Sequence, residues 1–138
     1  MKFDYLKLPT ANPKRRWIAR PMLPIRLIGP MGKWQGLALV DSGADVSLFG
    51  ERVGKRIGIS NVGHRVEKFG GVEGGSLSAN VAKVSIEIEG MSGQTEIEAG
   101  FTNSPGIDAI LGQDGFFDAF RIKFEKDHDV FEVIPVKK

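Results

Sequence analysis

Residues 37–46 read Leu-Ala-Leu-Val-Asp-Ser-Gly-Ala-Asp-Val, an apolar run that leads directly into an acid, a hydroxyl and a glycine. Each of these three residue types has a chemical use at the end of a rigid strand. Asp41 could hold and deprotonate a water molecule. Ser42 could hydrogen-bond to the backbone beneath the carboxylate and fix its orientation. Gly43 would let backbone or substrate come within contact distance of the acid. The stretch therefore predicts a candidate catalytic carboxylate.

The same tripeptide has an ordinary structural interpretation. Asp, Ser and Gly are the usual residues of a turn in which the aspartate side chain bonds to nearby backbone. Because Asp-Ser-Gly occurs in many unrelated turns, the tripeptide alone favours a strand that ends in such a turn. A choice between the two interpretations needs the rest of the sequence.

The sequence around this stretch predicts short strands. Residues 22–28 and 34–40 flank a Gly-Pro-Met-Gly-Lys turn at 29–33, which indicates a β-hairpin. Pro24 suggests that the first of these strands lies at a sheet edge, because proline cannot donate a ladder hydrogen bond. Eighteen glycines and seven prolines divide the whole sequence into short pieces.

Two further hairpins follow downstream. Residues 81–89 alternate between apolar and polar side chains, and 94–101 can pair with them across a short glycine-containing turn. Residues 120–125 and 130–136 form a second pair near the C-terminus. We therefore expect at least three hairpins.

Helical signal is scarce. Residues 49–57 could form one short helix, and Asp114 could cap a turn or two that runs through Phe120. Residues 69–75, Phe-Gly-Gly-Val-Glu-Gly-Gly, cannot be the interior of a rigid strand and predict a mobile loop or hairpin tip. Many short strands with few helices predict an all-β barrel or sandwich.

Length and composition indicate one globular domain. The chain has 138 residues, of which 41% are hydrophobic and 26% charged. We expect an irregular N-terminal arm over residues 1–16 and the folded domain over 17–138. The net charge is only +2, which argues against a nucleic-acid partner. One basic cluster lies near the N-terminus, with no recognisable binding motif: Lys14, Arg15, Arg16 and Arg20.

Several site types lack their residues. The chain has no cysteine, which excludes disulfides, zinc-thiolate sites and cysteine nucleophiles. His64 and His128 are far apart in sequence, so no metal site of usual spacing can be written. No apolar run approaches the ~20 residues of a membrane span, and the first residues lack a signal-peptide core. The expectation is a cytoplasmic protein with neither metal nor membrane partner.

Four features in order along the chain resemble the retropepsins, the single-domain aspartic proteases of retroviruses and their cellular and bacterial relatives. Asp41-Ser42-Gly43-Ala44 is similar to the family's Asp-(Thr/Ser)-Gly-Ala motif. Residues 17–21 are similar to its N-terminal approach. The glycines of 69–75 are similar in composition to its flap. Ile-Leu-Gly within 109–114 resembles the segment that crosses the active-site strand. The resemblance covers residues 17–136.

This resemblance implies a closed β-barrel of the retropepsin type with one or two short helices, acting as an aspartic endopeptidase. It implies catalytic roles for Asp41, Ser42 and Gly43. It implies substrate-binding roles for Ala44, Asp45, Gly70, Gly71, Val72, Glu73 and Gly74.

The chain departs from the retroviral pattern at two places. Gln113 stands where retroviral enzymes carry an arginine that pairs with the acid corresponding to Asp45. That ion pair is therefore lost or replaced, with Arg20 as one candidate. Retroviral chains also end soon after the short helix, whereas this chain continues through 120–125 and 130–136. The second departure leaves the form of a dimer interface open.

One aspartate motif implies two chains. Aspartic protease chemistry needs two carboxylates that share one proton, because like charges about 3 Å apart cannot both ionise. The sequence has no second Asp-(Thr/Ser)-Gly, so the site requires a homodimer with Asp41 beside Asp41 of the partner. The family pattern implies that Ser42 of each chain hydrogen-bonds across the axis. It also implies a polypeptide substrate, bound by strand addition under the flaps, and no cofactor.

Two other functions fit the sequence. A catalytically silent module of the same fold could serve dimerisation or peptide binding, since fold does not fix function. A small all-β adaptor could carry the Asp-Ser-Gly turn by coincidence. The presence of all three motif residues, together with the Ile-Leu-Gly segment, favours the protease.

Overall fold

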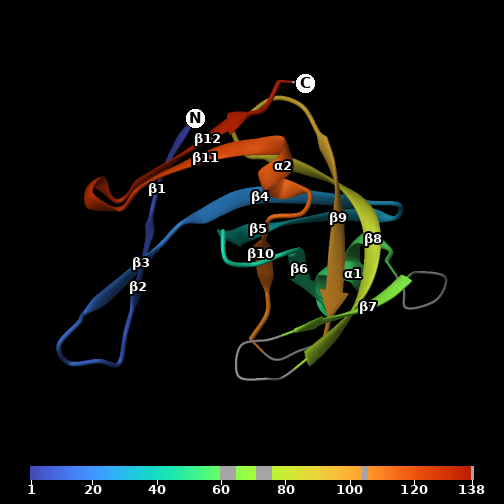
Figure 1. Cartoon of the computed structure of the whole chain (residues 1–138), viewed down its shortest axis with the longest axis horizontal. Helices are drawn as coiled ribbons and strands as arrows, with labels where there is room; N and C mark the ends of the chain where they lie inside the picture. Colours follow the sequence, from blue (N-terminus) through green and yellow to red (C-terminus); the bar gives the residue numbers. More distant parts are fainter. Residues whose placement is uncertain (60–64, 71–75, 104–105, 138) are drawn as a thin grey trace.

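Backbone hydrogen bonds close six strands into a barrel in the computed structural model of this chain (Figure 1). The structure describes residues 1–59, 65–70, 76–103 and 106–137. The elements are β1 (Lys2–Asp4), β2 (Leu6–Pro9), β3 (Trp17–Arg20), β4 (Met22–Gly29), β5 (Gly32–Val40), β6 (Ser47–Gly50), α1 (Glu51–Ile57), β7 (Arg65–Gly70), β8 (Ser76–Ile88), β9 (Thr95–Thr102), β10 (Ala109–Leu111), α2 (Phe116–Ala119), β11 (Phe120–Glu125), a 3-10 turn (Lys126–His128) and β12 (Val130–Pro135).

The strand order round the barrel is β4-β5-β10-β6-β9-β8, and β4 closes it by pairing with β8. Two of these pairings are parallel, β10 with β5 and β6 with β9, and the others are antiparallel. β7 extends the sheet beyond β8. The predicted all-β barrel is therefore confirmed over the alternative of a sandwich.

All three predicted hairpins are present. β4 pairs with β5, β8 with β9, and β11 with β12, each in antiparallel register. The predicted edge position of Pro24 is wrong, because β4 has a neighbour on both sides. Pro24 lies just beyond the last β4–β8 register pair, Ile25 with Ile88. At this position the Pro24 carbonyl accepts a hydrogen bond from the Glu89 N–H at 3.0 Å. The β4–β8 ladder does not require an N–H from Pro24, so the proline costs no hydrogen bond there.

Alternation along the strands fills the barrel. In β4, Leu23, Ile25 and Leu27 are fully or almost fully buried, and the residues between them are partly exposed. In β8, Val84, Ile86 and Ile88 repeat the pattern. These side chains meet those of the facing strands, because residues at period two share one face of a sheet.

Both helices are short and begin later than the sequence predicts. α1 begins at Glu51, since Phe49 and Gly50 belong to β6. α2 begins at Phe116, and Asp114 does not cap it. The Asp118 carboxylate accepts the Gly115 N–H at 3.2 Å instead. Among the described residues, no helix is long and apolar enough to cross a membrane.

The first sixteen residues differ from the irregular arm expected. β1 joins β12 and β11 in a three-stranded sheet, with Phe3 opposite Phe131 and their rings stacked at 5.6 Å. β2 pairs with β3 in a separate two-stranded ribbon. The β1–β12 pairing joins residues too far apart in the sequence for a local pattern to reveal. The β2–β3 ribbon is a local hairpin that was not predicted from the sequence.

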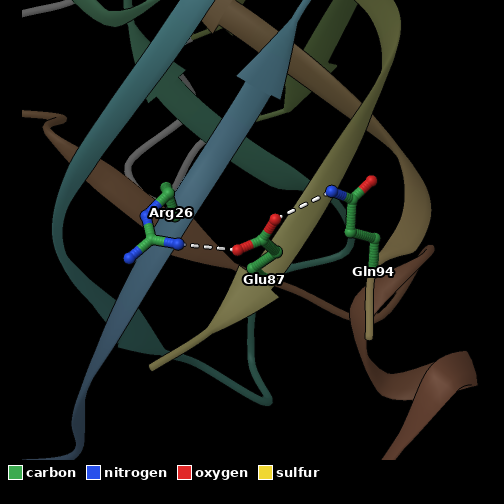
Figure 2. Close-up of polar contacts among 3 residues, drawn as sticks. All are labelled: Arg26, Glu87 and Gln94. Carbon is green, nitrogen blue, oxygen red and sulfur yellow. Dashed lines mark hydrogen bonds and ion pairs between the residues drawn. The ribbon is translucent and has the colours of Figure 1, made fainter. Parts of the chain in front are cut away.

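A polar cluster stabilises the seam at which the barrel closes (Figure 2). Arg26 of β4 stands opposite Glu87 of β8, and its guanidinium donates to Glu87 Oε2 at 2.8 Å. The Gln94 amide, just before β9, donates to Glu87 Oε1 at 2.8 Å. Figure 2 shows the two donors on opposite sides of the carboxylate, which therefore links three consecutive segments of the barrel wall.

Replacing Glu87 with alanine is expected to destabilise the fold by about 1 kcal/mol, because it removes both charge-assisted hydrogen bonds at a partly exposed site. The matched control is Glu96→Ala on the adjacent β9, whose ion pair with Lys83 is 3.9 Å long and well exposed. That control should change stability by less than about 0.5 kcal/mol. Urea unfolding of both variants measures the difference. Equal losses would mean that the seam cluster adds nothing specific.

Candidate active site

Asp41 follows β5 directly and lies where two parallel neighbouring strands end. Val40 of β5 stands opposite Leu111 of β10. The Asp41 N–H donates to the Leu111 carbonyl at 3.0 Å, which ties the residue to the end of both strands. The residue is half-buried. A carboxylate held in this way by strand backbone has a fixed position relative to the barrel.

A tight turn orients the Asp41 carboxylate. The Gly43 N–H donates to Asp41 Oδ1 at 2.9 Å, and the Ala44 N–H donates to the Asp41 carbonyl at 3.2 Å. A side chain at Gly43 would bring its Cβ to 3.2 Å from Oδ1, so glycine permits this close approach. Among the described residues, none donates a hydrogen bond to the second oxygen, Oδ2. The arrangement leaves that oxygen available to a water or a second carboxyl.

Ser42 does not orient the carboxylate within one chain, in contrast to the role first suggested for it. Its side chain is exposed, and its hydroxyl makes no hydrogen bond to any described residue. The Gly43 N–H takes the orienting role instead, because a two-residue turn brings that donor closer than the neighbouring hydroxyl. A contact of Ser42 across a dimer axis stays a prediction.

The segment after β10 crosses the loop after β5 and holds it in place. The Gln113 N–H donates to the Ala44 carbonyl at 2.8 Å, and the Asp114 N–H to the Asp45 carbonyl at 2.9 Å. Val46 and Asp114 form a parallel bridge beyond these bonds. The predicted association of the Ile-Leu-Gly segment with the Asp-Ser-Gly strand is present. The segment that follows β10 therefore holds the loop around Asp41 in place.

Gly112 makes this crossing possible. A Cβ at position 112 would lie 2.2 Å from the Val46 carbonyl oxygen and 2.7 Å from that of Ala44. The Gly112 N–H donates to the hydroxyl of Ser47, a fully buried polar residue, at 3.1 Å. Sequence reasoning missed Ser47. The available signal was a small polar residue inside the apolar run that follows Asp45.

Removing the Ser47 hydroxyl should weaken the crossing. Ser47→Ala leaves the buried Gly112 N–H without its acceptor, which costs about 1–3 kcal/mol. The matched control is Ser78→Ala on β8, where the side chain is exposed and the change should be near neutral. Thermal or urea unfolding compares the two variants. A Ser47→Ala variant as stable as the control would show that water or a relaxed backbone replaces the bond.

Gln113 has a defined partner, whereas no ion pair involves Asp45 among the described residues. The Gln113 amide donates to the Ser42 carbonyl at 2.6 Å and so holds the turn beside Asp41. Arg20 and Asp45 are both exposed, and neither forms an ion pair within the described part of the chain. The suggested substitution of Arg20 for the family arginine is therefore absent from the single chain.

The substrate-binding residues predicted in the glycine-rich stretch are only partly described. Gly70 ends β7 and stands opposite Ser76 of β8, so it is at the end of an antiparallel pair. Among the described residues, no hydrogen bond joins it to the loop around Asp41. Gly71, Val72, Glu73 and Gly74 lie outside the described residues, as does most of the stretch for which mobility is predicted.

A large groove in the described part of the chain lies away from Asp41. It has a volume of about 870 Å³ and runs between α1 and the residues before β10, from Trp34 and Arg52 to Asp108. Asp41 lies at the other end of β10, beside Leu111. Within the described ranges, no group of three or more acidic or histidine side chains could hold a metal ion.

Comparisons with known proteins assign no family to this chain. No protein-family model matches the sequence, and no curated protein matches it either. The case for a function therefore depends on the residues and contacts described above.

Proposed function

We propose that this chain is a retropepsin-like aspartic endopeptidase whose active site forms when two copies bring their Asp41 carboxylates together. The observation that carries the proposal is the geometry of the Asp41 turn. Its carboxylate stands at the end of two parallel strands, with Oδ1 held by the Gly43 N–H and Oδ2 left without a donor among the described residues. A turn with only a structural role would not require the additional support that the segment after β10 gives to the Asp41 loop.

In the proposed reaction the two carboxylates share one proton. The ionised carboxylate accepts a proton from a water molecule while the water oxygen attacks the peptide carbonyl carbon. The protonated carboxyl donates its proton to the carbonyl oxygen. The tetrahedral adduct then collapses. The carbon–nitrogen bond breaks as the leaving nitrogen takes up a proton from one carboxyl of the dyad, and a hydroxyl of the adduct returns a proton to the other carboxylate. Water is consumed, and one carboxylic acid and one amine are produced.

The rigid support of Asp41 fits this chemistry. Two carboxylates can share a proton only if both oxygens keep their positions within a few tenths of an ångström. The Leu111 carbonyl, the Gly43 N–H and the Gln113 amide each fix one part of the turn. The substrate class is an extended polypeptide, because the two-sided cleft of such a dimer would present strand edges to it.

The test of this proposal is the dependence of activity on chain concentration. Each chain supplies one Asp41, so cleavage of an unfolded protein substrate per chain should fall as the protein is diluted through its dimer dissociation constant. Below that concentration, a tenfold dilution should lower the total rate about a hundredfold, because the dimer population varies with the square of the monomer concentration.

A rate strictly proportional to chain concentration, in a range where sedimentation shows the dimer dissociating, would contradict the twofold site. A stable dimer without cleavage of unfolded proteins or peptide libraries would instead leave a silent module of the same fold. The two results differ in sedimentation and activity, so each has one interpretation.

A further inference from the structure

The ribbon formed by β2 and β3 is paired with no other strand of the described chain. We call residues 6–20 the arm. Figure 1 shows the arm extending away from the barrel, with its tip at the lower left. A two-stranded ribbon alone is marginally stable in water, and it needs a third strand or an apolar surface to pack against. The arm therefore lacks the cover that such a ribbon requires.

The arm is apolar and cationic at once. Three of its large apolar side chains are exposed, Leu6 by 37%, Leu8 by 39% and Trp17 by 57%. Between residues 6 and 20 there is no acidic residue, and the cations are Lys7, Lys14, Arg15, Arg16 and Arg20. The register sets Leu8 opposite Ile18 and Pro9 opposite Trp17, so both faces of the ribbon carry apolar side chains. A partner surface should be apolar with an acidic border.

The base of the arm adjoins the candidate active site. The Val40 N–H, one residue before Asp41, donates to the Pro21 carbonyl at 3.0 Å. β3 ends at Arg20, so the arm leaves the barrel beside the Asp41 strand. A second copy that brings its own Asp41 to this point comes within reach of the arm. The paired part of the arm is four residues long, or roughly 13 Å.

A hollow of about 440 Å³ lies beside the same site and matches the arm in chemistry. Its apolar lining includes Val46, Ile97 and Ala99. Four acidic residues line it as well: Glu96, Glu98, Asp114 and Asp118. Lys83 is the one cation among the described residues that line it, and it pairs with Glu96 at 3.9 Å. The hollow reaches the Asp41 loop through the bridge between Val46 and Asp114.

We propose that the arm of each chain docks in this hollow of a second copy, so that the two chains clasp each other beside the paired Asp41 residues. The leucine and tryptophan side chains cover the apolar lining, and the lysines and arginines face the acidic residues. Twofold symmetry makes both contacts identical, so every arm residue acts twice. The inference rests on the proposed function, since the second copy is the one that the proposed twofold dimer places beside Asp41.

The first test weakens the arm without touching the barrel. The variant Leu8→Ser/Trp17→Ser removes large apolar groups that are exposed in the single chain, so the monomer should fold unchanged. Sedimentation equilibrium of the full chain should show the dimer dissociation constant raised at least tenfold. The matched control is Met31→Ser, a side chain 82% exposed at the far turn between β4 and β5, which should leave the constant unchanged. An unchanged constant in the double variant, or a parent chain that stays monomeric, overturns the inference.

The second test locates the arm. Because the chain has no cysteine, Lys14→Cys gives a single attachment point for a thiol-linked photo-crosslinker at the arm tip. Equal amounts of ¹⁴N- and ¹⁵N-labelled chains are mixed and irradiated. We expect cross-links of mixed isotopic composition from the arm to peptides containing residues 96–100 or 114–118. Cross-links confined to one isotope, or to other surfaces, overturn the inference.

The two proposals fail separately. A dimer that depends on the arm but cleaves no peptide would contradict the proposed protease function and support docking of the arm. Concentration-dependent cleavage that is the same in the arm variant would contradict docking of the arm and support the proposed protease function.

Discussion

Replacing Asp41 with asparagine is expected to lower the rate of peptide-bond cleavage by on the order of 10²–10⁴-fold while the chain stays folded. Asparagine keeps the shape of the side chain, and its Oδ1 can still accept the Gly43 N–H that now bonds at 2.9 Å. It cannot take a proton from water or share one with a second carboxyl. The rate on an unfolded protein substrate, with circular dichroism as the check on folding, measures the effect. Asp45→Asn, an exposed acid four residues on, is the matched control and should cost less.

The same variant also tests whether the two acids act together. If parent and Asp41→Asn chains exchange completely and randomly, an equal mixture leaves about a quarter of the dimers with two acids. A mixed dimer has one carboxylate and one amide, so it should be close to inactive. The rate per parent chain should therefore fall to about half. A rate per parent chain that does not respond to the added variant would show that one chain suffices. A variant as active as the parent would remove the aspartic mechanism altogether.

Gly112→Ala is expected to be strongly destabilising, with a loss of about 3 kcal/mol or more. The added Cβ would lie 2.2 Å from the Val46 carbonyl oxygen and 2.6 Å from its carbon. These atoms are backbone, so no rotamer change can relieve the overlap. Either the crossing of the two loops opens or β10 shifts, and both move the support of Asp41. Activity should be lost together with stability.

The matched control is Gly93→Ala, in the turn between β8 and β9. Gly93 has a φ of +92° and nothing within 4 Å of a built Cβ. Alanine there should cost only the backbone strain of the left-handed region, about 1 kcal/mol. Urea unfolding of the two variants separates steric overlap from backbone strain. Similar losses in both would mean that the chain around Gly112 relaxes more easily than its contacts indicate.

Local patterns predicted three hairpins of this fold but missed the local ribbon of β2 and β3. The hairpins were predictable because each has alternating side chains and a turn signal within about twenty residues. The closure of β4 on β8 joins residues 25 and 88, and no local signal records such a pairing. The error at Pro24 has this origin. The same applies to β1, whose three residues form a strand by pairing with β12, more than 120 positions away in the sequence.

The candidate site was predictable in its chemistry and less so in its contacts. The sequence indicated a strand that ends at Asp41 and a close approach at Gly43, and both are present, whereas the catalytic role of Asp41 stays a prediction. The contacts of Ser47 and Gln113 were not predictable, even though Ser47 stands out as a polar residue in an apolar run, because each partner is about seventy residues away, Gly112 and Ser42. A motif shows which residues a reaction needs, whereas the support of those residues is a tertiary property.

The pairing of β1 with β12 also sets an order of events during synthesis. Phe3 is made well before Phe131, yet the two residues stand opposite each other in one sheet. At about 5–20 residues per second, the ribosome needs roughly 6–26 s to make the intervening 128 residues, the difference between the two positions. For that time the first strand has no partner, and an unpaired strand edge invites association with other chains. Nascent chains are therefore exposed to misassembly until β12 has been made, and slower translation between the two strands would lengthen that interval.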